Sequence, residues 1–406
     1  MVAQPGEIEV SPLVLTSFTA VNALGQGKAA IYAALRDGRT GLTRCDFEDA
    51  KVKTFCGRVA GLEEAPIDGA LSEFDGRNNR LAEIGLAQDN FGDAVAWARK
   101  RYGAARIAVI IGTSTSGILE TEHAYRRRDP ANGDLPGDYR FRYSHNLYAT
   151  THYVRRRLGL EGPAATISTA CSSSAKVFAN AWRWMQLGLC DAAVVGGVDS
   201  LCLNTLYGFN ALELVSPERC RPCDANRRGI SIGEAAGFAL LEDPARASGH
   251  SGIAFLGYGE SSDAYHMSTP HPEGLGAALA MRGALKTSGL APEQIDYVNM
   301  HGTASQVNDA MEDKAITQVL GARVPASSTK GWTGHALGAA GITEAVISAL
   351  CIQNGLLPGN LNTITLDPAM TSDMLLENRR AKVNRVMSNS FGFGGSNASL
   401  ILGRHA

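Results

Sequence analysis

Short runs of β-branched and apolar residues alternate with longer helical patterns along the whole chain, and this alternation limits the possible folds more than any other feature. Strand-like runs occur at residues 107–111, 192–195, 253–256 and 297–300. Helical spacing of apolar residues occurs at residues 175–187 and 342–352. Short apolar strands separated by helices are typical of sheets that are covered on both faces. The pattern therefore predicts an α/β protein.

A faint internal duplication is also present. Residues 165–171 and 325–331 each lead into a helical pattern, and residues 109–114 and 298–303 each bring a strand to a Gly-Thr turn. Repeated spacing of this kind predicts two similar halves. A Gly/Ser-rich connection at residues 247–252 places the boundary near residue 250, which gives halves 1–250 and 251–406.

Charge and composition exclude several classes of protein. The chain of 406 residues has a formal net charge of −2 and 45% hydrophobic residues, so no general attraction to nucleic acid or anionic membrane is expected. We find no basic leader followed by an apolar segment, and expect no apolar run of 18 residues that could span a bilayer. The eight scattered cysteines suit free thiols. A cytoplasmic protein that does not insert into membranes is predicted.

Cys171 is the first candidate for chemistry. It lies in Ser168-Thr-Ala-Cys-Ser-Ser-Ser174, a turn of small residues between a predicted strand and a predicted helix. The positive end of a helix dipole favours a thiolate, so a cysteine in this place can serve as a nucleophile. Cysteine is also among the most often buried residues, and an inert core thiol is the alternative.

Two histidine motifs follow in the second half. His301 ends an apolar strand in His301-Gly-Thr-Ala-Ser305, and His335 closes Lys330-Gly-Trp-Thr-Gly-His335. Ligands of open α/β sheets lie at the carboxyl ends of strands, so His301 is expected to face a site. Each histidine taken alone could equally be a structural residue with satisfied hydrogen bonds.

A glycine-dense turn, Asn389-Ser-Phe-Gly-Phe-Gly-Gly-Ser-Asn397, is the fourth candidate. Its backbone N–H groups could point at a developing oxyanion. Alone, the stretch would be no more than a flexible loop.

Together these motifs resemble, in order and spacing, the β-ketoacyl-[acyl-carrier-protein] synthases of the I/II type. The resemblance runs from about residue 21 to residue 402 and includes Arg221-Pro222, Asp224 and Gly233-Glu234. It implies a thiolase-like fold: two βαβαβαββ halves in a five-layered α-β-α-β-α sandwich. The N-terminal half would carry the nucleophilic cysteine and the C-terminal half both histidines.

The resemblance also implies an activity. Cys171 would accept an acyl group from an acyl carrier protein and condense it with a decarboxylated malonyl thioester, giving 3-oxoacyl-carrier protein. His301 and His335 would stabilise the enolate, and the backbone N–H groups of Cys171 and Phe393 would form the oxyanion hole. Lys330 would support the histidines, with Glu312 holding Lys330 by a hydrogen bond.

Further roles follow from the same resemblance. Thr303 and Ser305 would bind the pantetheine amides, Phe393 would act as a gate, and Asp309 would be structural. No metal and no cofactor is expected, because the carrier protein brings the phosphopantetheine. Members are dimers, so we expect a homodimer, or a heterodimer with a subunit like a chain-length factor.

Three departures from the family pattern bear on the substrate. Gln306 stands where Pro is usual, Arg228 replaces a common Asp, and Ile230 replaces a Phe beside the pantetheine tunnel. They favour a specialised synthase that elongates a polyene, aryl or polyketide chain, although synthesis of ordinary fatty acids stays open.

Other interpretations remain. A malonyl-thioester decarboxylase or acyltransferase would use the same residues, and a non-elongating partner subunit would bind the carrier without turnover. Cys220-Arg-Pro-Cys223 has the spacing of a redox or zinc site, but no second pair lies at ligand spacing. The basic runs 126–128 and 155–157 suit solvated surface or docking of an acidic carrier.

Overall fold

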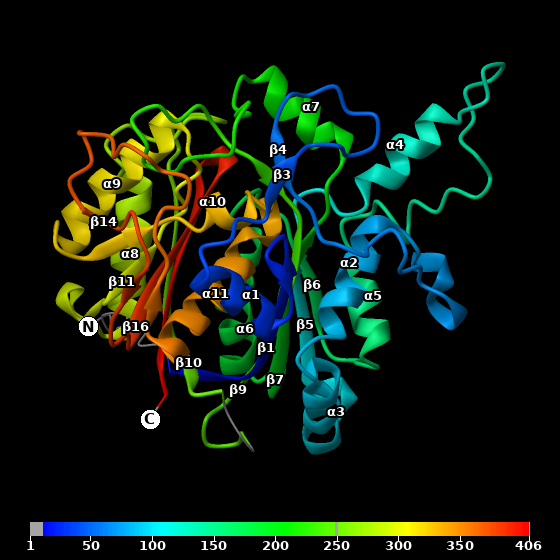
Figure 1. The fold of residues 1–406 in the computed structure, drawn as a ribbon. Coiled ribbons are helices and arrows are strands. Elements are labelled where there is room, and N and C mark those ends of the chain that lie inside the picture. Colours follow the sequence, from blue (N-terminus) through cyan, green and yellow to red (C-terminus); the bar gives the residue numbers. More distant parts are fainter. Residues whose placement is uncertain (1–10, 248–250, 406) are drawn as a thin grey trace, which may run out of the picture.

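The chain folds into two similar halves around a shared pair of central helices (Figure 1). The computed structural model describes residues 11–247 and 251–405. The predicted boundary at residue 250 lies outside the described residues.

The two halves have the same order of elements. The N-terminal half runs β1 (Leu13–Asn22), α3 (Phe91–Tyr102), β5 (Ile107–Gly112), α5 (Ala149–Arg157), β6 (Ala164–Ile167), α6 (Ser173–Gln186), β7 (Ala192–Asp199) and β9 (Ala235–Glu242). The C-terminal half runs β10 (Ile253–Ser262), α8 (Leu275–Ser288), β11 (Tyr297–Asn299), α9 (Gln306–Leu320), β12 (Pro325–Ser327), α11 (Ala340–Asn354), β16 (Arg385–Gly392) and β17 (Ser396–Arg404). Both therefore follow the predicted βαβαβαββ order.

Strand pairing repeats as well. The strand orders are β6-β5-β7-β9-β1 and β12-β11-β16-β17-β10, and in each set the first two pairings are parallel and the last two antiparallel. The two sets join where β1 pairs with β10. The faint sequence repeat is thus a structural duplication, as predicted.

Helices α6 and α11 lie between the two sets of strands. The outer layers are α3 and α5 over the N-terminal strands and α8 and α9 over the C-terminal strands (Figure 1). This arrangement confirms the five-layered sandwich.

Small residues allow the two central helices to approach closely. A Cβ at Gly341 of α11 would lie 2.5 Å from the backbone nitrogen of Ala175 in α6, so only glycine fits there. Contacts this close fix the beginning of α6 against the beginning of α11. Because the nucleophile lies before α6 and a histidine before α11, this packing positions the site.

One expectation about apolar segments is wrong. The stretch Leu337–Asn354 is long and apolar enough to cross a bilayer, but 89% of it is buried inside the fold. It is apolar because it forms the centre of a five-layered protein, where a helix has no solvent-facing side.

Candidate active site

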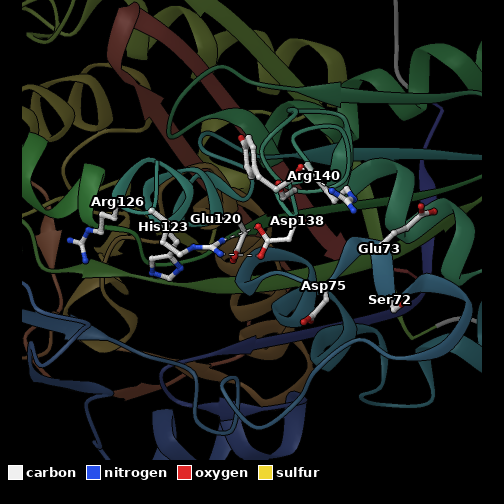
Figure 2. Close-up of a pocket in the computed structure, with 11 residues that line it drawn as sticks. Ser72, Glu73, Asp75, Glu120, His123, Arg126, Asp138 and Arg140 are labelled. Atoms are coloured by element: carbon white, nitrogen blue, oxygen red, sulfur yellow. Dashed lines mark hydrogen bonds and ion pairs between the residues drawn. The ribbon is translucent and has the colours of Figure 1, made fainter. Parts of the chain in front are cut away.

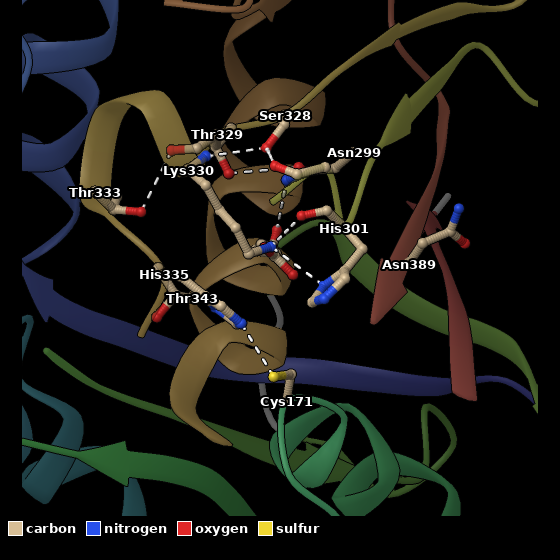
Figure 3. A network of polar contacts seen from close by, with 12 residues as sticks. Cys171, Asn299, His301, Ser328, Thr329, Lys330, Thr333, His335, Thr343 and Asn389 are labelled. Atoms are coloured by element: carbon tan, nitrogen blue, oxygen red, sulfur yellow. Dashed lines mark hydrogen bonds and ion pairs between the residues drawn. The ribbon is translucent and has the colours of Figure 1, made fainter. Parts of the chain in front are cut away.

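Loops at the ends of three strands bring the predicted residues together. Cys171 follows β6, His301 follows β11, and Lys330 follows β12 (Figure 3). His335 comes directly after the short helix α10 (Lys330–Thr333) and Gly334. The carboxyl ends of parallel strands are where such folds place ligands, and the duplication supplies one such edge from each half.

Cys171 is held in a tight turn. Ala170, directly before it, has a φ of 52°, a left-handed conformation that non-glycine residues seldom adopt. Cys171 is only 6% exposed, and burial raises the pKa of its thiol to about 11, although the charge of Lys330 works in the opposite direction. The sequence-based expectation that the helix N-terminus would favour the thiolate is therefore outweighed by burial, and at neutral pH the resting group is a thiol.

His335 contacts this thiol directly. Its Nε2 atom lies 3.0 Å from the Cys171 sulfur. The ring of His301 stands nearly perpendicular to that of His335, with 5.3 Å between centroids. Burial, aided by the charge of Lys330, lowers the pKa of both histidines well below 6.5, so both rings are neutral at pH 7. A neutral imidazole carries one N–H and can still donate one hydrogen bond.

Lys330 is buried beside the histidine pair. Its Nζ atom contacts the Glu344 carboxylate and the carbonyl oxygen of His301, and lies 3.3 Å from the Nδ1 atom of His301. The ammonium therefore occupies the side of His301 that carries Nδ1 (Figure 3).

Glu312 does not hold Lys330 by a hydrogen bond, and that prediction is wrong. Its two oxygens accept from the backbone N–H groups of His301 and Gly302, each at 2.8 Å, and from the Asn389 side chain at 3.1 Å. Burial raises the pKa of Glu312 to about 7. Glu312 thus fixes the backbone of the His301 turn, while the ion pair with Lys330 comes from Glu344 on α11.

Glu344 is the functional residue that sequence reasoning missed. A signal for it existed: it is the one charged residue of the apolar helix Ala340–Asn354, and a lone charge in a buried helix needs a partner. Burial raises its pKa to about 7, against the effect of Lys330.

The Asp309 carboxylate contacts neighbouring loops. It accepts from the backbone N–H groups of Cys223 at 2.9 Å and Ala304 at 3.2 Å, and its carboxylate lies 3.7 Å from the Arg227 guanidinium. These are the contacts of a residue that positions the segment after His301.

The glycine-dense turn lies directly over the nucleophile. The backbone N–H of Phe393 points at the Cys171 sulfur, and a Cβ at Gly392 would lie 3.3 Å from the Cys171 nitrogen. The two backbone groups expected to form an oxyanion hole are therefore neighbours. The Phe393 ring lies 5.6 Å from the ring of Phe209, and its action as a gate stays a prediction.

A cavity of about 780 Å³ leads from solvent to Cys171 and both histidines. Its wall includes the predicted pantetheine hydroxyls of Thr303 and Ser305, and all three departures from the family pattern, Arg228, Ile230 and Gln306. The cavity therefore connects solvent with the buried residues Cys171, His301 and His335.

A second cavity, of about 770 Å³, lies elsewhere and is lined mostly by charged side chains, among them Glu120, Arg126, Asp138 and Arg140 (Figure 2). None of the predicted catalytic residues lines it.

The three central residues also form a set of metal donors. One donor atom from each of Cys171, His301 and His335 lies within 4.8 Å of the others, a set that a thiophilic cation such as Zn²⁺ accepts. Among residues 11–247 and 251–405, neither Cys220 nor Cys223 belongs to such a group. The expectation that the protein uses no metal or cofactor stays a prediction.

The basic runs 126–128 and 155–157 lie away from the cavity that contains Cys171. Arg126 pairs with Asp49, Arg127 with Asp138 and Arg157 with Glu83. None of these arginines lines the cavity that contains Cys171. Docking of an acidic carrier on these runs stays a prediction.

Comparisons with known proteins agree with the fold and with this geometry. The sequence profile "Beta-ketoacyl synthase, N-terminal domain" matches residues 11–247, and "Beta-ketoacyl synthase, C-terminal domain" matches residues 254–363. A mitochondrial 3-oxoacyl-[acyl-carrier-protein] synthase of Arabidopsis thaliana is 32% identical over 96% of this chain and 92% of its own. A 3-oxoacyl-[acyl-carrier-protein] synthase 2 of Rhizobium meliloti is 41% identical over 73% of this chain and 74% of its own.

Solved structures extend the comparison. A ketosynthase from Xenorhabdus doucetiae, in complex with its chain length factor, has a TM-score of 0.87 and 39% identity over the full length of both chains. The ishigamide ketosynthase/chain length factor also has a TM-score of 0.87, with 28% identity over 98% of this chain and 100% of its own.

A buried cysteine with two histidines, in a duplicated five-layered fold, defines an acyl-transferring enzyme of the thiolase type. The chain belongs to the β-ketoacyl synthase family.

Proposed function

We propose that this chain is an active ketosynthase that joins a Cys171-bound acyl group to malonyl-acyl carrier protein, with loss of CO₂, to give 3-oxoacyl-carrier protein. The observation that carries the proposal is the contact of 3.0 Å between the Cys171 sulfur and His335 Nε2, at the buried end of a cavity open to solvent. The names of the similar proteins support the same reaction.

In the first half-reaction, Cys171 gives up its proton and its sulfur attacks the carbonyl carbon of the acyl thioester. His335 Nε2 is near enough to accept that proton when it presents its lone pair, and the departing pantetheine thiolate takes the proton in the end. The backbone N–H groups of Cys171 and Phe393 stabilise the tetrahedral oxyanion. The product is an acyl-enzyme thioester.

In the second half-reaction, the malonyl carboxylate leaves as CO₂ and its electron pair moves into the thioester as an enolate. Neutral His301 donates its one N–H to the enolate oxygen, and His335 donates from Nε2 in its other tautomer, in which Nε2 rather than Nδ1 carries the proton. The enolate carbon then attacks the acyl carbon on Cys171, a C–C bond forms, and the Cys171 thiolate leaves and takes up a proton from solvent in the cavity. Lys330 stabilises negative charge at this end of the cavity, and Glu344 keeps the ammonium paired.

A specialised pathway is the finer part of the proposal. Two of the similar solved structures, with identities of 39% and 28%, contain a ketosynthase together with a chain length factor. Arg228 and Ile230, which depart from the family pattern, line the cavity. We therefore propose a cytoplasmic enzyme that elongates a polyene, aryl or polyketide chain on an acyl carrier protein, paired with a partner subunit; a homodimer is the alternative. Because the chain is 42.9 kDa, a solution mass near 43 kDa would contradict both assemblies.

A primer panel tests this function. The purified protein is incubated with malonyl-carrier protein and acyl-carrier proteins of different length and unsaturation, with and without a chain-length-factor subunit. Mass spectrometry of the carriers should show a two-carbon β-keto extension of at least one primer. Release of CO₂ without any extended primer would favour the decarboxylase or the non-elongating subunit instead.

A further inference from the structure

Arg228 lies at the solvent end of the cavity whose buried end holds Cys171. Its side chain is exposed, and it lines the cavity together with the exposed residues Gln306 and Val307. The residues of the cavity therefore change from buried, reactive groups at Cys171 to an exposed guanidinium at the rim.

The backbone on both sides of Arg228 is fixed. The preceding residue, Arg227, is buried; its guanidinium donates to the carbonyl oxygens of Ser305 at 3.2 Å and Gln306 at 2.9 Å, and pairs with Asp367 at 2.6 Å. The following residue, Gly229, donates its N–H to the Ala304 carbonyl at 3.0 Å. Arg228 is therefore held beside the segment from Thr303 to Gln306.

Gly229 cannot be replaced without moving the backbone at Leu214. Its φ is +112°, and a Cβ there would collide with the carbonyl oxygen of Leu214. The Ile230 N–H also donates to that oxygen, at 2.7 Å. Arg227 and Gly229 are both buried and both donate to neighbouring backbone carbonyls. Arg228, between them, is the residue whose charge is exposed.

The Arg228 guanidinium has no ion pair or hydrogen bond with any residue in 11–247 or 251–405. Two acidic residues, Glu213 and Asp263, line the same cavity, but neither forms an ion pair with the Arg228 guanidinium. Asp263 already accepts from Asn397 Nδ2 at 2.8 Å. An unpaired guanidinium at a cavity rim is suited to bind an anion of planar or tetrahedral shape with two parallel hydrogen bonds.

Resting on the proposed function, we propose that Arg228 binds the phosphate at the carrier end of the phosphopantetheine arm, and that it thereby selects substrates that bear this phosphate. The thioester end of the arm must reach Cys171, so its phosphate remains at the rim. The malonyl carboxylate, the other anion of the reaction, reacts among the buried residues and is out of reach of an exposed rim side chain. The Asp that is common in the family at this position would repel the phosphate. Phosphate binding at this position therefore depends on the arginine that replaces it in this chain.

Protection of Cys171 from alkylation measures this binding without any need to know the acyl substrate. The probes are S-methyl pantetheine and S-methyl 4′-phosphopantetheine, which differ only in the phosphate and have no free thiol. The rate of iodoacetamide labelling at Cys171 is followed by peptide mass spectrometry, and the ligand concentration that halves it is compared for the two probes. The comparison is made in the wild-type chain and in Arg228→Gln, Arg228→Lys and Arg282→Gln. Arg282 is an exposed arginine of α8 that does not line the cavity.

The wild-type chain should be protected at about 5-fold lower concentration by the phosphorylated probe, the size expected for a partly exposed ion pair. In Arg228→Gln the two probes should protect at about the same concentration, Arg228→Lys should keep part of the difference, and Arg282→Gln should keep all of it. An unchanged ratio in Arg228→Gln would overturn the inference. The inference would also be overturned if Arg228→Gln weakened binding of the intact carrier protein without changing the ratio between the two probes. Arg228 would then contact the carrier surface and not the phosphate. Phosphate-selective protection in a chain that extends no primer would leave the inference standing and refute the proposed condensation.

Discussion

His335 Nε2 lies 3.0 Å from the sulfur of Cys171, and both residues are buried. The two residues are 164 positions apart in sequence and come from different halves of the duplicated fold. Because α6 and α11 pack against each other at Ala175 and Gly341, this contact depends on the central layer of the sandwich.

Replacement of either histidine should slow decarboxylation of malonyl-carrier protein. His301→Ala and His335→Ala each remove one N–H donor to the enolate, and a loss of about 10²- to 10³-fold in rate is expected for each. His335→Asn retains an N–H donor and should lose less than His335→Ala. Release of ¹⁴CO₂ from labelled malonyl-carrier protein measures the rate. If both alanine variants released CO₂ as fast as the wild-type chain, the histidines could not be the enolate donors.

Lys330 should be coupled energetically to Glu344 more strongly than to Glu312. Double-mutant cycles in urea unfolding combine Lys330→Met with Glu344→Gln, and Lys330→Met with Glu312→Gln. The ion pair should give the first cycle a coupling of about 2 kcal/mol, and the second should stay below about 0.5 kcal/mol. A larger coupling in the cycle with Glu312 would reinstate the pairing that the sequence suggested.

Alkylation at two cysteines should respond differently to pH. Burial raises the pKa of Cys171 to about 11, so its labelling by iodoacetamide should rise about tenfold per pH unit from pH 7 to 10. The pKa of half-buried Cys45 is lowered to about 6 by a hydrogen bond with the Cys56 thiol, so its labelling should be nearly constant over the same range. Peptide mass spectrometry reads both sites in one sample, so each is a control for the other. A plateau at Cys171 already near pH 7 would mean that its proton has moved to His335 in the resting enzyme.

The packing of α6 against α11 should tolerate no added methyl group. Gly341→Ala would place a Cβ 2.5 Å from the Ala175 nitrogen, and the free energy of unfolding should fall by about 1–3 kcal/mol. Gly208 in the exposed part of α7 (Leu203–Ala211) has open space around it, so Gly208→Ala should raise the free energy by about 0.5–1 kcal/mol. Equal effects of the two substitutions in urea unfolding would contradict the close packing.

Much of the fold could be predicted from the sequence because its signals are local. The predicted strand at 107–111 is observed as Ile107–Gly112, and the predicted helix at 175–187 as Ser173–Gln186. The motifs around Cys171, His301 and His335 follow strand ends, so their convergence depends only on the order of the strands. The repeat in sequence predicted two similar halves, and the resemblance to the family implied their βαβαβαββ order.

Features that depend on burial and on contacts distant in sequence could not be predicted. The pairing of Lys330 with Glu344 needs the orientation of α11, which no local pattern encodes. The raised pKa of Cys171 reflects how completely the two halves enclose it, and the apolar stretch Leu337–Asn354 is explained only by the layers around it.

A single-turnover experiment can show whether the acyl group on Cys171 is itself extended. Cys171 is loaded with a ¹³C-labelled acyl group from an acyl-carrier protein that serves as primer. The acyl-enzyme is isolated, and malonyl-carrier protein is then added. Cys171→Ala is treated in the same way. In the wild-type chain, the peptide that contains Cys171 should gain the mass of one acyl group, and the label should then appear in a carrier-bound 3-oxoacyl chain two carbons longer. The variant should neither take up the label nor form that product. A wild-type acyl-enzyme that releases the label as free acid, or returns it unextended to the carrier while CO₂ is lost, would contradict the condensation.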